Sequence, residues 1–208
     1  MYIIYIRQER QPARSKIMVV VNEEITTKFD CMTNKELGAY IRGKLKEKGY
    51  NSKKVSVSVK DCGYSTSIHC TIKDLSINDK EIEKIVNEVE YIRYDGYAQE
   101  ILAGCNRFVD VRYDWKLKNE AQNAQLENAK EIINNSENSF IYTDENGTRF
   151  SVEKENRKFN DQEWIAYSIW KWEKDENYGT HVQSNMTIEN VYWWLAEKLA
   201  FENARKAA

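Results

Sequence analysis

The fold is decided by residues 33–72, which read TNKELGAYIRGKLKEKGYNSKKVSVSVKDCGYSTSIHCTI. Thr33 and Glu36 have the spacing of a capping box, in which a hydroxyl and a carboxylate bond backbone amides at a helix start. The apolar positions that follow recur at three- and four-residue spacing: Leu37, Tyr40, Ile41 and Leu45. This pattern predicts a helix with one buried face, and Gly49 is suited to end it in a left-handed conformation.

Two alternating segments and a second helix follow. The apolar members of the two segments are Val55, Val57 and Val59, then Ile68, Cys70 and Ile72. Such alternation is typical of half-buried strands, and the turn between them predicts an antiparallel pair. Asn78 with Glu81 is a second helix-start signal. The buried stripe expected for that helix is Ile82, Ile85, Val86 and Val89.

The order of these elements resembles a known family. The helix ends in Lys-Glu-Lys-Gly-Tyr at 46–50, and the strands read Val-Ser-Val-Ser-Val at 55–59 and Ser-Ile-His-Cys-Thr-Ile at 67–72. After the second helix comes Tyr-Asp-Gly-Tyr at 94–97. Over residues 33–114 this order is similar to a large polyvalent protein-associated domain. The resemblance implies an accessory protein of a phage, plasmid or conjugative element, and it carries over no catalytic residues.

The rest of the chain predicts a further hairpin and helices. Trp115 to Ile133 is rich in alanine and asparagine and predicts a helix. Asn146-Gly147 lies between alternating apolar residues, a strong signal for a β-hairpin. Asp161 to Asp175 and Thr187 to Arg205 have apolar residues at helical spacing and are both predicted to be helices.

We therefore expect an α+β protein with two regions. The first, residues 1–114, is a small mixed domain with antiparallel strands and two helices, and Tyr2–Arg7 and Lys16–Val21 are two further strand candidates. The second, residues 115–208, is a linking helix, a β-hairpin and two aromatic-rich helices.

Composition places the chain among globular proteins, because 208 residues with 41% hydrophobic and 31% charged content can form a core and a solvated surface. The sequence has no run of eighteen apolar residues and no signal-peptide pattern, so we expect a cytoplasmic protein with no membrane contact. Its four cysteines form no Cys-x-x-Cys pair. This predicts reduced, mostly buried thiols.

The sequence predicts no catalytic residues, metal site or cofactor, and we expect that the protein is not an enzyme. His69 and His181 are the only histidines, and sequence shows no positioned partner for either. A nucleophile pair of His69 with Cys62 or Cys105 is formally possible, but Cys70, the cysteine next to His69, points to the opposite face of the strand. The carboxylates that could gather around a metal ion, Asp61, Asp95, Asp110 and Asp114, lack the spacing of a metal-ligand motif. The eight glycines are scattered and form no phosphate-binding loop.

Charge suggests one binding function. Residues 1–60 hold 13 Lys and Arg against 6 Asp and Glu, whereas residues 61–208 hold 18 against 27. A basic helix at 34–48 can follow a row of phosphates. The order of a helix, two strands and a second helix is also similar to that of small double-stranded RNA-binding folds. The candidate nucleic-acid-binding residues are Lys35, Arg42, Lys44, Lys46, Lys53 and Lys54. The function predicted from them is that of a nucleic-acid-binding accessory protein of a conjugative element.

The mobile-element setting favours a protein-directed function over this one. In that hypothesis the chain binds a protein or nucleoprotein of a host defence system and blocks it, as an anti-CRISPR inhibitor does. Acidic and aromatic side chains would form the surface. The candidate partner-binding residues are Glu83, Glu88, Trp164, Trp170, Trp193 and Trp194. A homodimer formed through the aromatic residues, and a plain structural module, are the alternatives.

Overall fold

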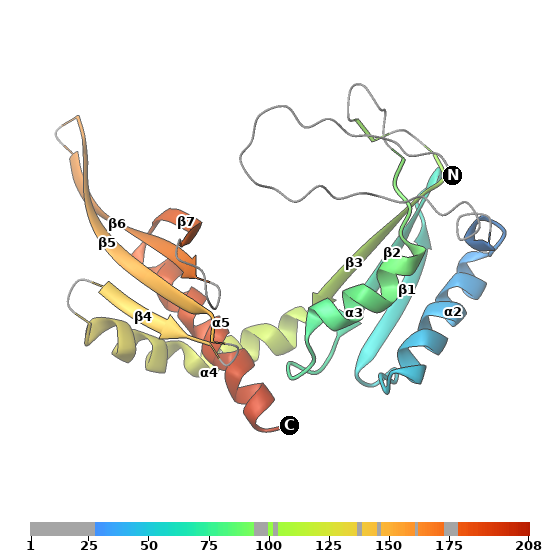
Figure 1. Cartoon of the computed structure of the whole chain (residues 1–208), viewed down its shortest axis with the longest axis horizontal. Coiled ribbons are helices and arrows are strands. Elements are labelled where there is room, and N and C mark those ends of the chain that lie inside the picture. The colour runs from blue at the N-terminus through green and yellow to red at the C-terminus, as the bar shows by residue number, and fades with distance from the viewer. Residues whose placement is uncertain are drawn as a thin grey trace. The chain divides into compact units, whose positions relative to one another are not determined.

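The computed structural model has the predicted α+β fold, with a three-stranded mixed sheet and a four-stranded antiparallel sheet (Figure 1). The residues that it describes are 28–93, 100–101, 104–136, 139–144, 147–160, 162–172 and 179–208. Three expected features lie outside them: the strands Tyr2–Arg7 and Lys16–Val21, and the turn Tyr94–Tyr97. The chain divides into two compact units, Met1–Tyr113 (unit 1) and Asp114–Ala208 (unit 2), and each is described by itself.

Unit 1 places two helices on one face of a three-stranded sheet. Its elements are α2 (Asn34–Glu47), β1 (Val55–Asp61), β2 (Ser65–Ile72), α3 (Asp79–Val86), the 3-10 turn η1 (Asn87–Val89) and β3 (Asn106–Tyr113). The central strand β2 pairs antiparallel with β1, as predicted, and parallel with β3. Because parallel neighbours need a crossover connection, α3 lies between β2 and β3 in the chain.

The predicted start and end of α2 are confirmed. The Thr33 hydroxyl accepts the Glu36 amide at 3.3 Å, and the Glu36 carboxylate accepts the Thr33 amide at 2.8 Å. The bond from the Thr33 amide, and a second one in which the Thr33 hydroxyl donates to the same carboxylate at 2.8 Å, lower the pKa of Glu36. At the other end Gly49 has a φ of +86°, the left-handed conformation that glycine adopts at little cost.

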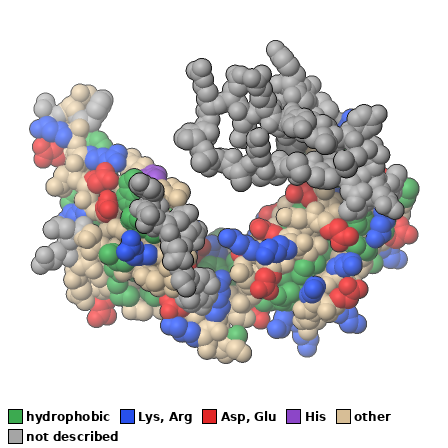
Figure 2. Space-filling model, viewed as in Figure 1, with side chains coloured by type: hydrophobic (Ala, Val, Ile, Leu, Met, Phe, Trp, Pro, Cys, Tyr) green, Lys and Arg blue, Asp and Glu red, His purple; other side chains and the backbone are tan. Residues whose placement is uncertain are grey.

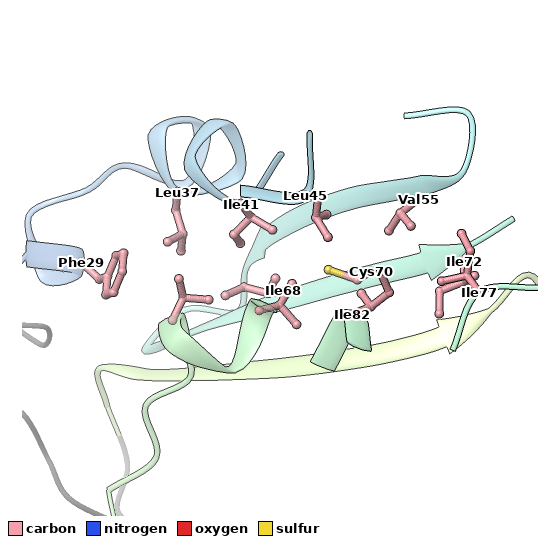
Figure 3. Close-up of a cluster of buried hydrophobic side chains, with 12 residues drawn as sticks. Phe29, Leu37, Ile41, Leu45, Val55, Ile68, Cys70, Ile72, Ile77 and Ile82 are labelled. Carbon is pink, nitrogen blue, oxygen red and sulfur yellow. The ribbon is translucent and has the colours of Figure 1, made fainter. Parts of the chain in front are cut away.

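The core of unit 1 lies between the two helices and the sheet (Figure 3). α2 contributes Leu37, Ile41 and Leu45, all nearly inaccessible to solvent. The other buried side chains include Val55, Ile68, Cys70, Ile72, Ile82 and Val86. Every second residue of β2 from Ile68 to Ile72 therefore faces the helices, and the intervening residues face away from them.

Unit 2 is built on a four-stranded sheet with helices on one face. Its elements are α4 (Trp115–Asn134), β4 (Ser139–Thr143), β5 (Arg149–Phe159), β6 (Gln162–Trp172), β7 (Thr180–Met186) and α5 (Ile188–Lys206). The strands pair in sequence order and are all antiparallel. The predicted hairpin is present as β4 and β5, and Gly147 has a φ of +78°.

The prediction of a helix over Asp161–Asp175 is wrong, because Gln162–Trp172 forms strand β6. The apolar residues of this segment fit the helical period of 3.6 residues and also the strand period of two residues. In a strand, Trp164, Trp170 and Trp172 share one face, and the odd-numbered apolar residues 165, 167 and 169 share the other. β-branched and aromatic residues suit a pleated surface, and β6 pairs with β5 from Gln162 to Trp172. Pairing with the preceding strand β5, in a hairpin that closes between Phe159 and Gln162, therefore outweighs the helical spacing of this short stretch.

Side chains from α4, α5 and the helix-facing side of the sheet form the core of unit 2. Its fully enclosed members include Ala129, Ile169, Val191, Leu195 and Ala196. Lys118 of α4 forms an ion pair with Glu197 of α5 at 3.0 Å, and the Gln122 side-chain amide donates to the Trp193 carbonyl at 2.7 Å. These contacts join the two helices that cover the sheet.

The cysteine prediction needs a correction. All four thiols are free, but only Cys70 is buried, whereas Cys31, Cys62 and Cys105 are exposed. Cys70 lies on the helix-facing side of β2, while the other three occupy turns at element ends, where no core surrounds them. Burial, with a smaller contribution from Asp110, raises the pKa of the Cys70 thiol to about 11. None of the described helices is long and apolar enough to cross a membrane.

Candidate binding surfaces

The basic residues of α2 form a row on the outer side of unit 1. Lys35, Arg42 and Lys46 are all exposed, and Lys53 is exposed beyond the end of the helix. The spacings of seven and four residues place the three α2 side chains on one side of the helix. Arg42 Nη1 donates to the Val57 carbonyl at 3.3 Å, so its guanidinium lies against strand β1.

Two of the predicted cations are engaged in ion pairs. Lys44 Nζ is 3.8 Å from the Glu47 carboxylate, and Lys54 Nζ is 3.9 Å from the Asp74 carboxylate. Exposed pairs of this kind contribute little to stability but reduce the local positive charge. Acidic and basic side chains also alternate over the face of the molecule in Figure 2. Among the described residues no acidic side chain forms an ion pair with Lys35, Arg42 or Lys46, and these three are therefore the stronger phosphate-binding candidates.

The acidic residues of α3 and η1 have two different roles. Glu83 is exposed and available to a partner. Glu88 instead accepts a hydrogen bond from the Tyr40 hydroxyl of α2 at 2.8 Å, and Glu81 accepts one from the Tyr50 hydroxyl at 2.6 Å. The first bond thus ties α2 to η1, and the second ties the turn after α2 to α3. Glu88 is part of the structure of unit 1 as well as a candidate for partner binding.

These bonds predict a loss of stability at high pH. Burial and the Glu88 bond raise the pKa of Tyr40 to about 12, and the Glu81 bond and burial raise the pKa of Tyr50 to about 12. Unfolded tyrosines ionise near pH 10, so the stabilisation is complete below pH 10 and is lost as the pH rises to about 12. We expect the double variant Tyr40→Phe and Tyr50→Phe to weaken this pH dependence, measured by urea unfolding from pH 8 to 11. Equal slopes for both proteins would contradict the assignment.

The face of the unit 1 sheet that points away from the helices carries a chain of hydrogen bonds. His69 Nδ1 lies 3.0 Å from Asp110 Oδ2, and His69 Nε2 lies 2.9 Å from the Ser67 hydroxyl. Arg112 Nε is 3.6 Å from the same Asp110 oxygen. When Nδ1–H donates to the Asp110 carboxylate, Nε2 carries no proton and accepts a hydrogen bond from the Ser67 hydroxyl. Sequence reasoning missed these partners of His69, because Asp110 reaches it only through the parallel pairing of β2 and β3.

Serine, histidine and aspartate in this order also occur in hydrolases, but acyl transfer requires donors for an oxyanion as well. Ser67 lies on β2, the central strand, whose backbone amides pair with β1 on one side and β3 on the other. The strand itself therefore offers no free backbone donors beside Ser67. Cys62 and Cys105, the candidate partners of His69, are exposed in turns, and Cys70 points into the core on the opposite side of the strand.

The carboxylates considered as metal ligands serve other purposes. Asp114 caps α4 by accepting the Leu117 amide at 3.1 Å, and Asp61 accepts the Gly63 amide at 2.8 Å. Asp110 is the partner of His69, and Asp95 lies outside the described residues. No group of three or more His, Cys, Asp or Glu side chains in the described part of the chain is placed to hold a metal ion.

Arg107 is a buried arginine that sequence reasoning missed. Its side chain is 8% exposed, donates from Nε to the Val89 carbonyl at 2.9 Å, and forms an ion pair with Asp30. The guanidinium also lies over the rings of Tyr91, at 5.2 Å, and Phe29, at 5.9 Å. It lines a pocket of about 490 Å³ between the start of α2 and the turn after β1. The alternation of residues in the sequence of β3 does not distinguish Arg107 from an arginine that faces solvent, so sequence gives no signal for its burial.

The four tryptophans predicted to bind a partner lie in different environments. Trp164 on β6 and Trp193 on α5 are 42% and 37% exposed. Trp170 is half-buried and packs edge-on against the His181 ring at 4.9 Å. Trp194 packs edge-on against Phe150, at 5.5 Å, within the core. Trp164 and Trp193 are therefore accessible to a partner, whereas Trp194 mainly stabilises unit 2.

Strand geometry places several apolar side chains on the side of the unit 2 sheet away from the helices. Because Ile169 faces the core, Trp164, Trp170 and Trp172 project from the opposite side of β6. Ile141 of β4 lies on that side too, since it pairs with Ser151, which in turn pairs with Trp170. Ile141 is 59% exposed, so this sheet face offers apolar area to a partner.

Comparison of the chain with protein-family models, with curated proteins and with solved structures gave no match.

Proposed function

We propose that this chain is a non-catalytic binding protein of a phage or mobile element, acting in the cytoplasm on a protein or nucleoprotein of a host defence system. It inhibits that target, as an anti-CRISPR protein does, by covering a functional surface. The observation that carries the proposal is the exposure of Ile141 and Trp164 on the helix-free face of the unit 2 sheet. The mobile-element setting comes from the family resemblance of residues 33–114.

The apolar surface supports this function because large aromatic and aliphatic side chains supply most of the energy at protein interfaces. Trp164 carries a polar handle as well, since its Nε1 donates to the Asn185 side chain at 3.4 Å. Arg157, the cross-strand neighbour of Trp164, and Glu155 form a charged pair at 2.7 Å beside it. An apolar centre with a charged rim is the usual composition of such an interface.

The test is inhibition of a CRISPR defence. We expect expression of the chain to restore plaque formation by phage in cells with CRISPR immunity, and the purified chain to inhibit DNA cleavage by the corresponding effector complex. Trp164→Ala should weaken inhibition about 30-fold, the equivalent of about 2 kcal/mol at an interface hot spot. Trp115→Ala is the matched control, because Trp115 is 76% exposed but lies outside the sheet. No restoration across representative CRISPR types would overturn the proposal.

One further variant and one further measurement identify the surface involved. Glu83→Lys reverses an exposed charge of α3 and should leave inhibition intact if the unit 2 face binds the target. Light scattering on the wild type and on Trp164→Ala tests self-association. A dimer that dissociates in the variant would assign this face to a second copy of the chain and would count against the inhibitor function.

A second candidate function is nucleic-acid binding by α2. The exposed row of Lys35, Arg42 and Lys46 favours it, because cations along one side of a helix can follow a phosphate backbone. In that case the chain would be an accessory protein of a conjugative element rather than an inhibitor.

A further inference from the structure

We propose that the helix-free face of the unit 1 sheet binds single-stranded nucleic acid, with Phe108 as the stacking residue. The binding platform consists of three cross-strand rows, each with one residue from β1, β2 and β3: Ser56, Thr71 and Arg112; Ser58, His69 and Asp110; Lys60, Ser67 and Phe108. The inference goes beyond the protein-directed function of unit 2 and extends the nucleic-acid candidate from α2 to the sheet.

Accessibility is the first argument. None of the nine platform residues is buried, whereas the residues that alternate with them on β2, such as Ile68 and Cys70, are fully buried. The described helices of unit 1 pack on the other side of the sheet. The platform is thus a polar surface on the central part of the unit, where a flat ligand can lie across three strands.

Charge is the second argument. Lys60 and Arg112 are exposed cations, while the platform has a single acidic residue, Asp110. That carboxylate is already engaged, with His69 at 3.0 Å and Arg112 at 3.6 Å. Over the whole chain acidic residues outnumber basic ones, 33 to 31, so this face departs from the average composition in the direction that suits phosphates.

The ring of Phe108 favours single-stranded nucleic acid over a duplex as the ligand. It is the one aromatic residue of the platform and lies in the same row as Ser67 and Lys60. Neighbouring strands lie about 4.8 Å apart, so Lys60 starts roughly 10 Å from Phe108, within reach of the phosphates beside a stacked base. Aromatic rings stack on unpaired bases, whereas a duplex offers none along its length. The platform has four hydroxyl-bearing residues, Ser56, Ser58, Ser67 and Thr71. The Ser67 hydroxyl already bonds His69 and the Ser56 hydroxyl donates to the Thr71 carbonyl, so Ser58 and Thr71 are the ones offered to sugar and phosphate oxygens.

The cationic row of α2 adjoins this platform. Because the Arg42 guanidinium donates to the Val57 carbonyl, it lies at the edge strand β1, next to Ser56 and Ser58 in the chain. A single-stranded nucleic acid whose bases lie across the sheet can therefore place its phosphate backbone along Arg42 and Lys46. This continuity gives the ligand one path over both surfaces.

The experiment is fluorescence anisotropy with the full chain and labelled 12-nucleotide oligo-dT, oligo-U and a 12-base-pair duplex, at 50 and 200 mM salt. We expect single strands to bind more tightly than the duplex. Phe108→Leu, which keeps apolar bulk but removes the ring, should weaken single-strand binding about 10-fold, whereas Phe108→Tyr should retain it. Lys60→Ala should reduce the slope of log affinity against log salt by about 0.7. Thermal melting of each variant confirms that the fold is kept.

The outcomes separate the platform from the other candidate surfaces. Wild-type affinity in both Phe108→Leu and Lys60→Ala, or no single-strand binding at 50 mM salt, would overturn the platform. Equal binding of duplex and single strands that is lost only in the triple variant Lys35→Ala, Arg42→Ala and Lys46→Ala would also overturn it and would assign binding to α2. The plaque assay is a separate measurement, so loss of inhibition in Trp164→Ala carries no information on the platform.

Discussion

Replacing Ile169 by alanine is expected to destabilise unit 2 by about 3 kcal/mol, because it removes a branched side chain from a site with no solvent exposure. Ile169 lies in the core with Val152, its cross-strand partner, and with Val191 and Leu195 of α5. Part of the loss is transfer of the side chain to water, and part is the cavity that its neighbours cannot fill. Tryptophan fluorescence in urea measures this change directly, since all six tryptophans lie in unit 2.

Ile141→Ala is the matched control, since it removes the same atoms from the other face of the same sheet. Ile141 is 59% exposed, so its truncation should change the free energy of unfolding by no more than about 0.5 kcal/mol. If the proposed inhibitor surface is correct, the same variant also inhibits its target less well. Equal destabilisation by the two variants would contradict the assignment of β6 as a strand with Ile169 turned toward the helices.

The elements of unit 1 could be predicted because local signals and tertiary packing agree there. The capping box at Thr33, the left-handed Gly49 and the alternation of β1 and β2 each specify the structure that the chain adopts. In β6 these levels conflict, since its aromatic residues fit a helix by spacing and a strand by preference. The pairing with the preceding strand β5 decides between them, and the periodicity of the β6 segment taken by itself does not show this pairing.

The candidate surfaces show the same limit. The exposed row on α2 follows from helical spacing alone and was predicted. Ser67 and His69 share a strand face by the same local logic, but their link to Asp110 depends on a register between residues 41 positions apart. Exposure of the tryptophans depends on packing too, because Trp194 and Trp193 are neighbours in sequence and yet only Trp194 meets the ring of Phe150.

Replacing Arg107 by alanine is expected to destabilise unit 1 by about 2 to 3 kcal/mol, the largest effect that we expect from any charged residue. The substitution removes the Nε bond to the Val89 carbonyl, the ion pair with Asp30 and the contacts with two aromatic rings. Loss of one partner of a buried pair costs about 3 to 5 kcal/mol, but Asp30 is 43% exposed and water can solvate it afterwards. We therefore expect a loss of about 2 to 3 kcal/mol, which lies below the range for a fully buried pair.

Arg107→Lys distinguishes the geometry of the guanidinium from its charge. A lysine keeps the positive charge but cannot donate at once to Val89 and Asp30 from a planar group, so we expect most of the loss to remain. Arg93→Ala is the control, because Arg93 is exposed and its backbone amide, which donates to the Asn106 side chain at 2.8 Å, is unaffected by the substitution. Hydrogen exchange of peptides from unit 1 measures each variant. Full protection in Arg107→Ala would mean that η1 and the start of β3 are held by their backbone bonds, such as Tyr91 to Arg107, without the guanidinium.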